Sequence, residues 1–200
     1  MIYLSFDIEE FDMPKEYGFD IPFERQMSIS REGLTAILDL LKKHEAKATF
    51  FSTVVFAQNA PDLIERLLGE GHELASHTYY HSDFAIEHLL SSKEALESQF
   101  GVTVEGLRMP RMLEVATTDV KQAGYLYNSS IIPTFLPGRY NKLHVPRAMF
   151  IEDGLWQIPA GVSPWRIPLF WLSFHNFPLW YYKHLLSRTV GSLGYAALYF

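Results

Sequence analysis

The sequence contains no cysteine among its 200 residues. Disulfide bonds and thiolate metal ligands are therefore excluded. The absence also removes the residue that usually indicates an oxidising or a reducing compartment, so the compartment is not readable from cysteine usage.

Basic residues are in the minority. The chain has 17 Lys and Arg against 23 Asp and Glu, which gives a formal net charge of -6. A surface that binds nucleic acid needs clustered Lys and Arg, so the composition argues against nucleic acid as a partner. With 48% hydrophobic and 20% charged residues, the chain has the balance of a folded protein, and we expect one domain over residues 1–200.

Long hydrophobic runs are also missing. No basic and then apolar leader precedes the first apolar stretch, so no secretory signal is visible and a cytoplasmic location is the default expectation. The aromatic segment from Trp165 to Tyr182 is interrupted by charged residues and prolines, and it falls short of the about 20 apolar residues that span a membrane. Two interpretations of it stay open: packing in the core and loops, or contact with a ligand or a membrane surface.

Short apolar, β-branched stretches alternate with segments of helical periodicity along the whole chain. Helices are predicted over Leu34–Leu41 with Ser30 as the cap, after Pro61, and over 84–100, 117–123 and 179–190, whereas residues 10–28 and 131–150 are predicted as loops. Seven strands are predicted, at Ile2–Ile8, Ala48–Val55, His72–Ser76, Val102–Leu107, Tyr125–Asn128, Leu155–Ile158 and Ala196–Phe200.

This alternation implies parallel strands joined by crossover helices, which is the α/β class. Seven strands suit a distorted (β/α)7 barrel with outer helices better than an open sheet, although periodicity alone does not separate the two. In such barrels the functional residues lie at the carboxyl ends of the strands. Five chemically suggestive residues fall at predicted strand ends: Asp7, Glu9, His77, Arg108 and Pro110.

The segment Ser76-His77-Thr78-Tyr79-Tyr80-His81 holds two histidines four residues apart. If the segment forms a helical turn, both imidazoles reach one metal ion. Because eight histidines produce such a spacing by chance, the pair alone is a weak signal. Asp7-Ile8-Glu9 strengthens it, since a His/His/carboxylate set leaves coordination positions open for water.

Together these residues resemble the motifs of the polysaccharide deacetylases, carbohydrate esterase family 4, whose fold is called NodB-like. The resemblance runs from about Tyr3 to Phe200. Ser5-Phe6-Asp7-Ile8-Glu9 is similar to the first motif, Thr-Phe-Asp-Asp, while His77 to His81 matches the second, His-Ser/Thr-x-x-His, and Arg108-Met109-Pro110 matches the third, Arg-x-Pro. Gly124 to Asn141 resembles a bacterial branch associated with exopolysaccharide loci, and Leu198-Tyr199-Phe200 is similar to the lead-in to the last motif, Leu-x-Ile/Phe-His.

The resemblance implies a metal-dependent deacetylase, which hydrolyses N-acetyl groups of a polysaccharide or its precursor. The metal implied is Zn²⁺, with Co²⁺ or Ni²⁺ as alternatives. The first motif reads Asp-Ile-Glu here, and by analogy with a related Asp-x-Asp form Asp7 would be the base. Glu9, His77 and His81 would be the metal ligands. Strand alternation would point Glu10 away from them.

The resemblance also implies roles for the remaining motif residues. Arg108 would hold Asp7 ionised and aimed, and the backbone N–H of Arg111 would stabilise the oxyanion. Pro110 would contact substrate, and Leu198 would line the pocket for the acetyl methyl group. The alternative for Asp7 and Arg108 is a purely structural ion pair.

Two other functions stay open at this stage. One is the same amide hydrolysis on a small or lipid-linked N-acyl sugar, for which the aromatic segment from Trp165 to Tyr182 is the motivation. The other is a non-catalytic relative that binds carbohydrate without hydrolysing it.

The last predicted strand, Ala196–Phe200, ends where the family's final motif places a histidine that acts as general acid. We therefore expect the 200 residues to be a truncated chain whose next residue is histidine. The alternative is a natural terminus, with His144 or His175 as the proton donor.

Overall fold

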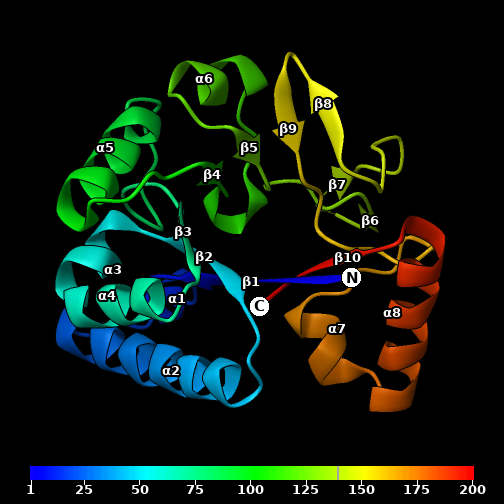
Figure 1. Cartoon of the computed structure of the whole chain (residues 1–200), viewed down its shortest axis with the longest axis horizontal. Helices are drawn as coiled ribbons and strands as arrows, with labels where there is room; N and C mark the ends of the chain where they lie inside the picture. Colours follow the sequence, from blue (N-terminus) through cyan, green and yellow to red (C-terminus); the bar gives the residue numbers. More distant parts are fainter. Residues whose placement is uncertain (139) are drawn as a thin grey trace.

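The computed structural model describes residues 1–138 and 140–200, so Arg139 of the stretch compared with the exopolysaccharide branch lies outside the described residues. The chain folds into a curled, half-barrel sheet with helices packed around it (Figure 1). The described strands of this sheet are ordered β10-β1-β2-β3-β4-β5-β9-β8. They span Ile2–Ile8 (β1), Ala48–Ser52 (β2), Glu73–Ser76 (β3), Gly106–Leu107 (β4), Tyr127–Asn128 (β5), Phe150–Glu152 (β8), Leu155–Gln157 (β9) and Ala196–Tyr199 (β10).

Neighbouring strands in this sheet are parallel, except for β8 and β9, which form an antiparallel pair at one edge. The seven parallel strands correspond to the seven that the sequence predicts, so the α/β class with parallel strands is confirmed. The first and last strands are direct neighbours, with Leu4 of β1 in register with Leu198 of β10. The two ends of the chain therefore build adjacent parts of one sheet.

Helices connect the strands and cover the outer side of the sheet, as parallel connections require. They span Met13–Glu16 (α1), Phe23–Lys43 (α2), Val54–Asn59 (α3), Pro61–Gly69 (α4), His88–Phe100 (α5), Pro110–Met112 (the 3-10 turn η1), Thr117–Gln122 (α6), Trp171–Asn176 (α7) and Leu179–Leu193 (α8). In chain order, a small antiparallel hairpin of β6 (Phe135–Leu136) and β7 (Tyr140–Asn141) follows β5 and precedes β8, and Figure 1 draws it below β8. Among the described helices, none combines the length and the apolar character needed to cross a bilayer.

Several sequence-based boundaries are wrong. Ser30 lies inside α2, which begins at Phe23 after Pro22, so part of the expected 10–28 loop is helical. Strand β2 ends at Ser52, earlier than predicted, because Thr53 caps α3 by accepting the Phe56 N–H at 3.1 Å. The β-branched valines that follow had favoured a longer strand in the sequence analysis. The expected 131–150 loop instead contains β6, β7 and the start of β8.

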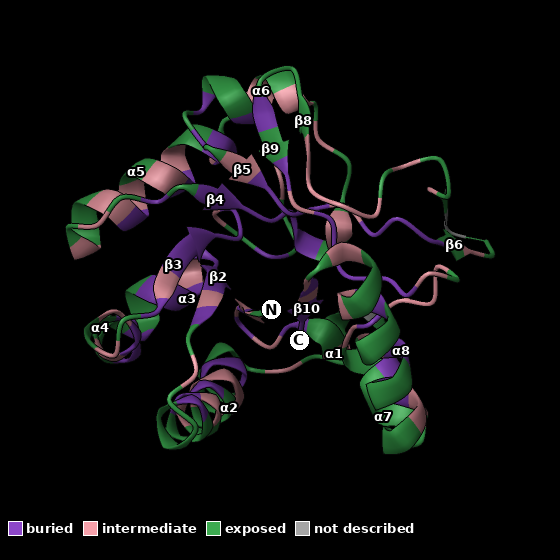
Figure 2. Cartoon of the chain, turned by 45° about the vertical axis from the view of Figure 1, so that its right-hand side comes forward, coloured by how far each residue is buried: buried purple, intermediate pink, exposed green. Residues whose placement is uncertain are grey.

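The main core lies between the sheet and the helices α2 to α5. Phe50 of β2, Leu38 of α2 and Leu67 of α4 are among its fully buried side chains. Figure 2 shows the same division: helix α2 carries buried residues on one side and exposed residues on the other. A second cluster joins Leu198 of β10 to Leu185 of α8.

A glycine in β4 sets a tight contact inside this architecture. A Cβ atom at Gly106 would overlap the ring of Tyr127, whose hydroxyl donates to Glu73 at 2.7 Å. We expect Gly106→Ala to lower the free energy of unfolding by about 1–3 kcal/mol, because the ring must move. Urea unfolding measures it, with Gly33→Ala on the exposed face of α2 as the control, where open space predicts a gain of about 0.5–1 kcal/mol. Equal effects of the two changes would contradict this assignment.

His72 predicts a pH dependence of stability. Burial, with a smaller contribution from Lys47, lowers the pKa of His72, and its Nδ1 accepts the Ala48 N–H at 3.2 Å. A depressed pKa in the folded state means that the unfolded chain binds the proton first as pH falls through about 6.5, so stability decreases toward acid. We expect His72→Asn to reduce the loss of unfolding free energy between pH 7 and pH 5. An identical pH slope in both proteins would contradict the prediction.

Candidate metal centre and active site

The residues that end strands β1, β3 and β4 lie together at one edge of the sheet. His77 donates its backbone N–H to Ser52 at 2.8 Å, and Arg108 donates its backbone N–H to Ser76 at 2.9 Å. These bonds continue the parallel ladder by one residue beyond each strand. The ladder thus fixes the starting points of the His77 and Arg108 side chains before any ligand is considered.

The segment from His77 to His81 is an irregular loop, so the expected helical turn is wrong. Thr78 takes a left-handed φ of 66°, and the carbonyl groups of Thr78 and Tyr79 accept the backbone N–H groups of Val54 and Val55 at the start of α3. The loop is therefore held by the free N–H groups of a helix N-terminus. It still brings the two imidazoles together, in rings 6.0 Å apart and nearly parallel at 19°.

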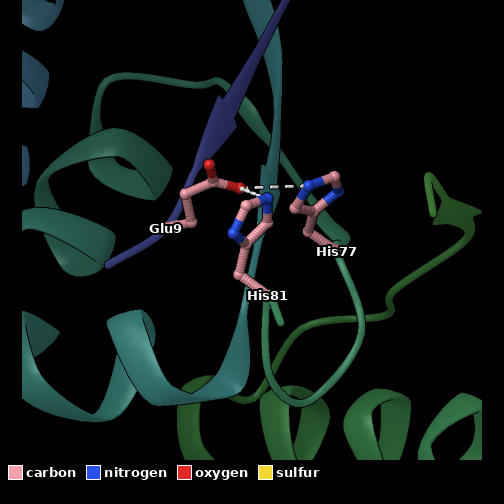
Figure 3. A group of neighbouring side chains, drawn as sticks. All are labelled: Glu9, His77 and His81. Atoms are coloured by element: carbon pink, nitrogen blue, oxygen red, sulfur yellow. Dashed lines mark ion pairs between the residues drawn. The ribbon is translucent and has the colours of Figure 1, made fainter. Parts of the chain in front are cut away.

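Figure 3 shows how Glu9 reaches both imidazoles from the end of β1. Glu9 Oε2 lies 3.2 Å from His77 Nε2 and 3.3 Å from His81 Nε2. Among the described His and acidic residues, these three form the one cluster whose ligand atoms lie within 4.8 Å of one another. Ligand atoms at about 2.0–2.2 Å from a tetrahedral ion are separated by about 3.3–3.5 Å, so the two Glu9 distances fit such an ion.

The Nδ1 atoms of His77 and His81, on the side of each ring away from Glu9, have hydrogen-bond partners of their own. His77 Nδ1 lies 2.8 Å from the Arg108 carbonyl, and His81 Nδ1 lies 2.7 Å from Asp12 Oδ1. Both partners only accept, so each Nδ1 carries a hydrogen, and in the neutral form of each ring Nε2 offers its lone pair toward Glu9. The Glu9 Oε2 atom is buried and has no hydrogen-bond partner among the described residues. With both rings neutral, three lone pairs converge on one point, where a proton or a metal ion stabilises them.

The electrostatics agree with this geometry. Burial lowers the pKa of His77, but the nearby charges of Asp7 and Glu9 outweigh burial and raise that pKa above its ordinary value. The field that attracts a proton to Nε2 also attracts a metal ion. The donor set of two imidazoles and one carboxylate fits a divalent transition metal.

Asp12 is a site residue that the sequence analysis missed. It is buried, contacts His81 Nδ1 and accepts from the Ser82 hydroxyl. Burial raises the pKa of Asp12, but the hydrogen bond from Ser82 and the charge of His81 outweigh it and leave that pKa below its ordinary value. Nothing in the local sequence separates Asp12 from other loop acids, because its role depends on a contact with a residue 69 positions away.

Glu10 points away from the imidazole nitrogens that face Glu9, as strand alternation predicts. Its Oε2 accepts the Thr53 hydroxyl at 2.8 Å, and its Oε1 accepts the His81 backbone N–H at 3.4 Å. Glu10 is absent from the cluster of possible ligand atoms. It therefore ties the end of β1 to α3 and to the histidine loop.

Asp7 and Arg108 form a close ion pair beside the cluster. Arg108 Nη1 donates to Asp7 Oδ1 at 2.7 Å, and Nη2 donates to the hydroxyls of Ser5 at 2.9 Å and Ser129 at 3.0 Å. The guanidinium carbon lies 4.0 Å from the ring centre of Phe51. Arg108 is thus buried and fixed in a single direction, with its charge balanced by Asp7.

Pro110 and Arg111 follow Arg108 in the turn η1. Pro110 is buried, whereas Arg111 donates from Nη2 to the Ser82 hydroxyl at 2.9 Å. Arg111 and Met112 both have φ of 54°, a left-handed conformation that costs energy in residues with a side chain. Strain of this kind persists where the surrounding structure imposes it, and here it lies directly next to the site.

Leu198 does not lie with the other predicted site residues. Its side chain packs with Leu185 of α8 and with Leu4, on the helix-covered side of the sheet. Tyr199, its neighbour in β10, has the opposite direction and places its ring centre 5.2 Å from the Arg108 guanidinium carbon. The acetyl-pocket role of Leu198 stays a prediction, and in this structure strand alternation turns Tyr199 rather than Leu198 toward Arg108.

The aromatic segment from Trp165 to Tyr182 is partly exposed and partly packed. The Trp165, Trp171 and Trp180 side chains are exposed, whereas Tyr182 is buried. Phe170 stacks on Tyr199 with ring centres 5.5 Å apart, so the segment reaches the aromatic ring beside Arg108. His175, one of the alternative proton donors, packs against the rings of Trp171 and Phe174.

The curled, mostly parallel sheet with a His/His/carboxylate cluster at its strand ends defines an α/β protein with a candidate metal centre, and comparison with known proteins identifies the family. The family model for polysaccharide deacetylase matches residues 1–127, which is more than half of the chain. The chain belongs to the polysaccharide deacetylase family.

Curated relatives match over shorter segments. A chitooligosaccharide deacetylase of Bradyrhizobium sp. (strain ANU 289) is 45% identical over 49 residues, which cover 24% of this chain and 22% of that protein. The peptidoglycan-N-acetylmuramic acid deacetylase PdaA of Bacillus subtilis is 37% identical over 62 residues, or 31% of this chain and 24% of that protein. The matched segments thus span about a quarter of these relatives.

Solved structures agree on the fold. A Pseudomonas aeruginosa PAO1 protein described as a probable polysaccharide deacetylase superposes with a TM-score of 0.67 and 16% sequence identity. The superposition covers 99% of this chain and 76% of that one. The NodB-like fold implied by the sequence motifs is thereby confirmed.

The Asp12 contact predicts an effect on metal affinity. Partners that hold the second ring nitrogen of a metal-binding histidine typically contribute 10- to 100-fold in affinity. We expect Asp12→Ala to weaken Zn²⁺ or Co²⁺ binding by about 10- to 100-fold, because His81 loses the group that orients it. Calorimetric titration of the apo protein measures the affinity, and Asp20→Ala, which removes an exposed acid of the same charge, serves as the control. Unchanged affinity in Asp12→Ala would contradict the assignment.

Proposed function

We propose that this protein is a metal-dependent deacetylase that hydrolyses N-acetyl groups of a polysaccharide or of its precursor. The observation that carries the proposal is the convergence of lone pairs from Glu9, His77 and His81 beside the Asp7–Arg108 pair. Membership of the polysaccharide deacetylase family supports it, as do the names of the matched relatives, which refer to chitooligosaccharide and peptidoglycan.

Glu9, His77 and His81 would hold the metal ion. The nitrogen and oxygen donor set favours Zn²⁺, with Co²⁺ or Ni²⁺ as substitutes. A divalent ion bound there supplies Lewis acidity, which acidifies water and polarises an amide carbonyl. His77 and His81 are both buried, so the chain contributes rigid ligands whose outer nitrogens are already bonded to Arg108 and Asp12.

Asp7 would act as the general base. Attack of water on the acetyl carbon forms a carbon–oxygen bond, and the proton that water loses passes to the Asp7 carboxylate. Arg108 is the positioning residue for this step, because its Nη1 contact at 2.7 Å holds the carboxylate in one orientation. The alternative of a purely structural pair predicts that Asp7 affects stability but not turnover.

Breaking the carbon–nitrogen bond then releases acetate and an amine. The strained turn at Arg111 would present its backbone N–H to the oxyanion that precedes this cleavage, with Pro110 beside the substrate. The leaving nitrogen needs a proton from a general acid. The Phe200 carbonyl accepts the Asp7 backbone N–H at 3.0 Å, so the end of the described chain lies next to the proposed base.

The proposal separates the role of Asp7 from that of His77. We expect Asp7→Asn to retain Zn²⁺ and to lose turnover by about 10²- to 10⁴-fold, the usual size of general base assistance. His77→Ala should lose the metal itself. Bound zinc and amine release from N-acetylhexosamine oligomers are the two measurements, with Asp20→Asn as a control for loss of one acid. Near-normal turnover by Asp7→Asn would remove Asp7 from the mechanism.

A second candidate is the same hydrolysis on a lipid-linked N-acyl sugar at a membrane surface. The exposed Trp165, Trp171 and Trp180 side chains favour it, since tryptophan is common at membrane interfaces. Sedimentation with lipid vesicles distinguishes the two substrates. The exopolysaccharide branch that the sequence resembles points to a bacterial exopolysaccharide as the source of the polymer. A protein that binds oligosaccharide in the presence of chelator but never releases amine would instead be a non-catalytic relative.

A further inference from the structure

A cavity lies close to the candidate site, at the ends of β5 and β9. Its volume is 380 Å³, and its lining includes Asn128, Ser130 and Gln157 at the ends of β5 and β9. Ser129, between the first two, bonds to Arg108 and therefore points to the site. Because successive side chains alternate across a sheet, Asn128 and Ser130 point away from Arg108. One short segment thus forms a wall shared by the candidate site and this cavity.

The floor of the cavity holds an amide group that lacks a partner. Gln157 is completely buried, and its Oε1 has no hydrogen-bond partner among the described residues. Its Nε2 donates to Thr117 Oγ1 at 3.1 Å and to Glu152 Oε2 at 3.3 Å. The Glu152 carboxylate accepts only, so it fixes the amide with Oε1 as the remaining acceptor. A buried amide oxygen without a donor is a place where a ligand hydroxyl gains a hydrogen bond.

Asn128 provides the complementary donor. It is buried and lies beside Gln157 in the register of β5 and β9. Its Oδ1 accepts the backbone N–H of Ser130 at 3.1 Å and also the Ser130 hydroxyl, which leaves the Nδ2 group available to donate. The cavity therefore presents a neutral acceptor and a neutral donor side by side, the pair that neighbouring hydroxyls of a sugar ring match.

The charges around the cavity balance one another. Lys142 lies 3.1 Å from Glu114, and Glu152 is engaged by Thr117 and Gln157. An anion such as phosphate needs unbalanced Lys or Arg, and the described residues form no metal-type cluster at this place. Apolar side chains complete the lining, namely Leu113, Val115, Ile131 and Val145. Apolar walls with a few buried amide groups are typical of a pocket for a small neutral ligand.

We infer that this cavity is a binding subsite for a neutral sugar unit, separate from the candidate metal centre and occupied by another residue of the same oligosaccharide. The inference rests on the proposed function for the identity of the substrate. Its connection to the site is direct: Ser130 Oγ accepts the Met109 backbone N–H at 2.8 Å, and the Ser129 carbonyl accepts from Arg108 Nε at 3.2 Å. A sugar that binds Asn128 and Gln157 therefore contacts the segment that holds Arg108.

Two variants test the subsite without changing any residue placed in the catalytic or metal-binding machinery. Gln157→Leu removes the buried amide at similar volume, and Val145→Trp fills the cavity from a loop. The matched control is Ile151→Trp, an exposed position of β8 outside the cavity lining. Thermal unfolding checks that each variant is folded. If Gln157→Leu does not fold, Val145→Trp still tests the subsite.

The probes are the tetramer and the monomer of N-acetylglucosamine. We expect both variants to weaken tetramer binding, measured by calorimetry with chelator present, by at least 10-fold, and to raise KM for the tetramer by a similar factor. Binding and turnover of the monomer, and all properties of Ile151→Trp, should stay unchanged. Equal losses for monomer and tetramer would mean that the variants disturb the site itself, which overturns the subsite.

The outcomes also separate this inference from the proposed function. If the wild-type protein binds the tetramer through Asn128 and Gln157 but releases no amine, the proposed function fails and the subsite stands. If the wild-type protein hydrolyses the tetramer and both variants match it in KM and affinity, the subsite fails and the proposed function stands. Absence of saturable tetramer binding by the wild-type protein also overturns the subsite.

Discussion

One row of backbone hydrogen bonds determines where the site forms. Beyond the last register pairs of β1 to β5, the next N–H of each strand still bonds to its neighbour: Thr53 to Ile8, His77 to Ser52, Arg108 to Ser76 and Ser129 to Leu107. Parallel bonds of this kind hold the strand ends level. Side chains that are tens of residues apart in sequence therefore start at the same level of the sheet. They point to the same face, because side chains at matching positions of neighbouring strands lie on one side of the sheet.

Arg108 depends on that row and gives the site its charge balance. A buried guanidinium is costly unless its donors are satisfied, and here they meet Asp7, Ser5 and Ser129 while its flat face lies over Phe51. Such a pair is a poor source of stability compared with apolar packing. The ion pair instead fixes the orientation of the Asp7 carboxylate, because a carboxylate held by one fixed donor at 2.7 Å has little freedom to turn.

The sequence predicted the features that depend on local patterns. Seven parallel strands followed from alternating apolar segments, and the convergence of His77, His81 and Glu9 followed from motif spacing combined with the strand-end rule. The prediction was wrong where tertiary contacts override local pattern. The histidine loop is held by the N-terminus of α3 and not by a helical turn of its own, and this contact cannot be read from spacing.

The acids at the end of β1 and just after it show why the cluster attracts a cation. Asp7 has Arg108 as its partner, Glu10 has the donors of Thr53 and of the His81 backbone, and Asp12 has Ser82 and His81 Nδ1. Glu9 differs, because its buried Oε2 has no hydrogen-bond partner in the described part of the chain and lies 3.2 and 3.3 Å from the Nε2 atoms of His77 and His81. Like charges this close repel unless each is compensated. Since the neighbouring acids already have partners, the charge of Glu9 is left to be compensated by a proton or a metal ion between its carboxylate and the two imidazole nitrogens.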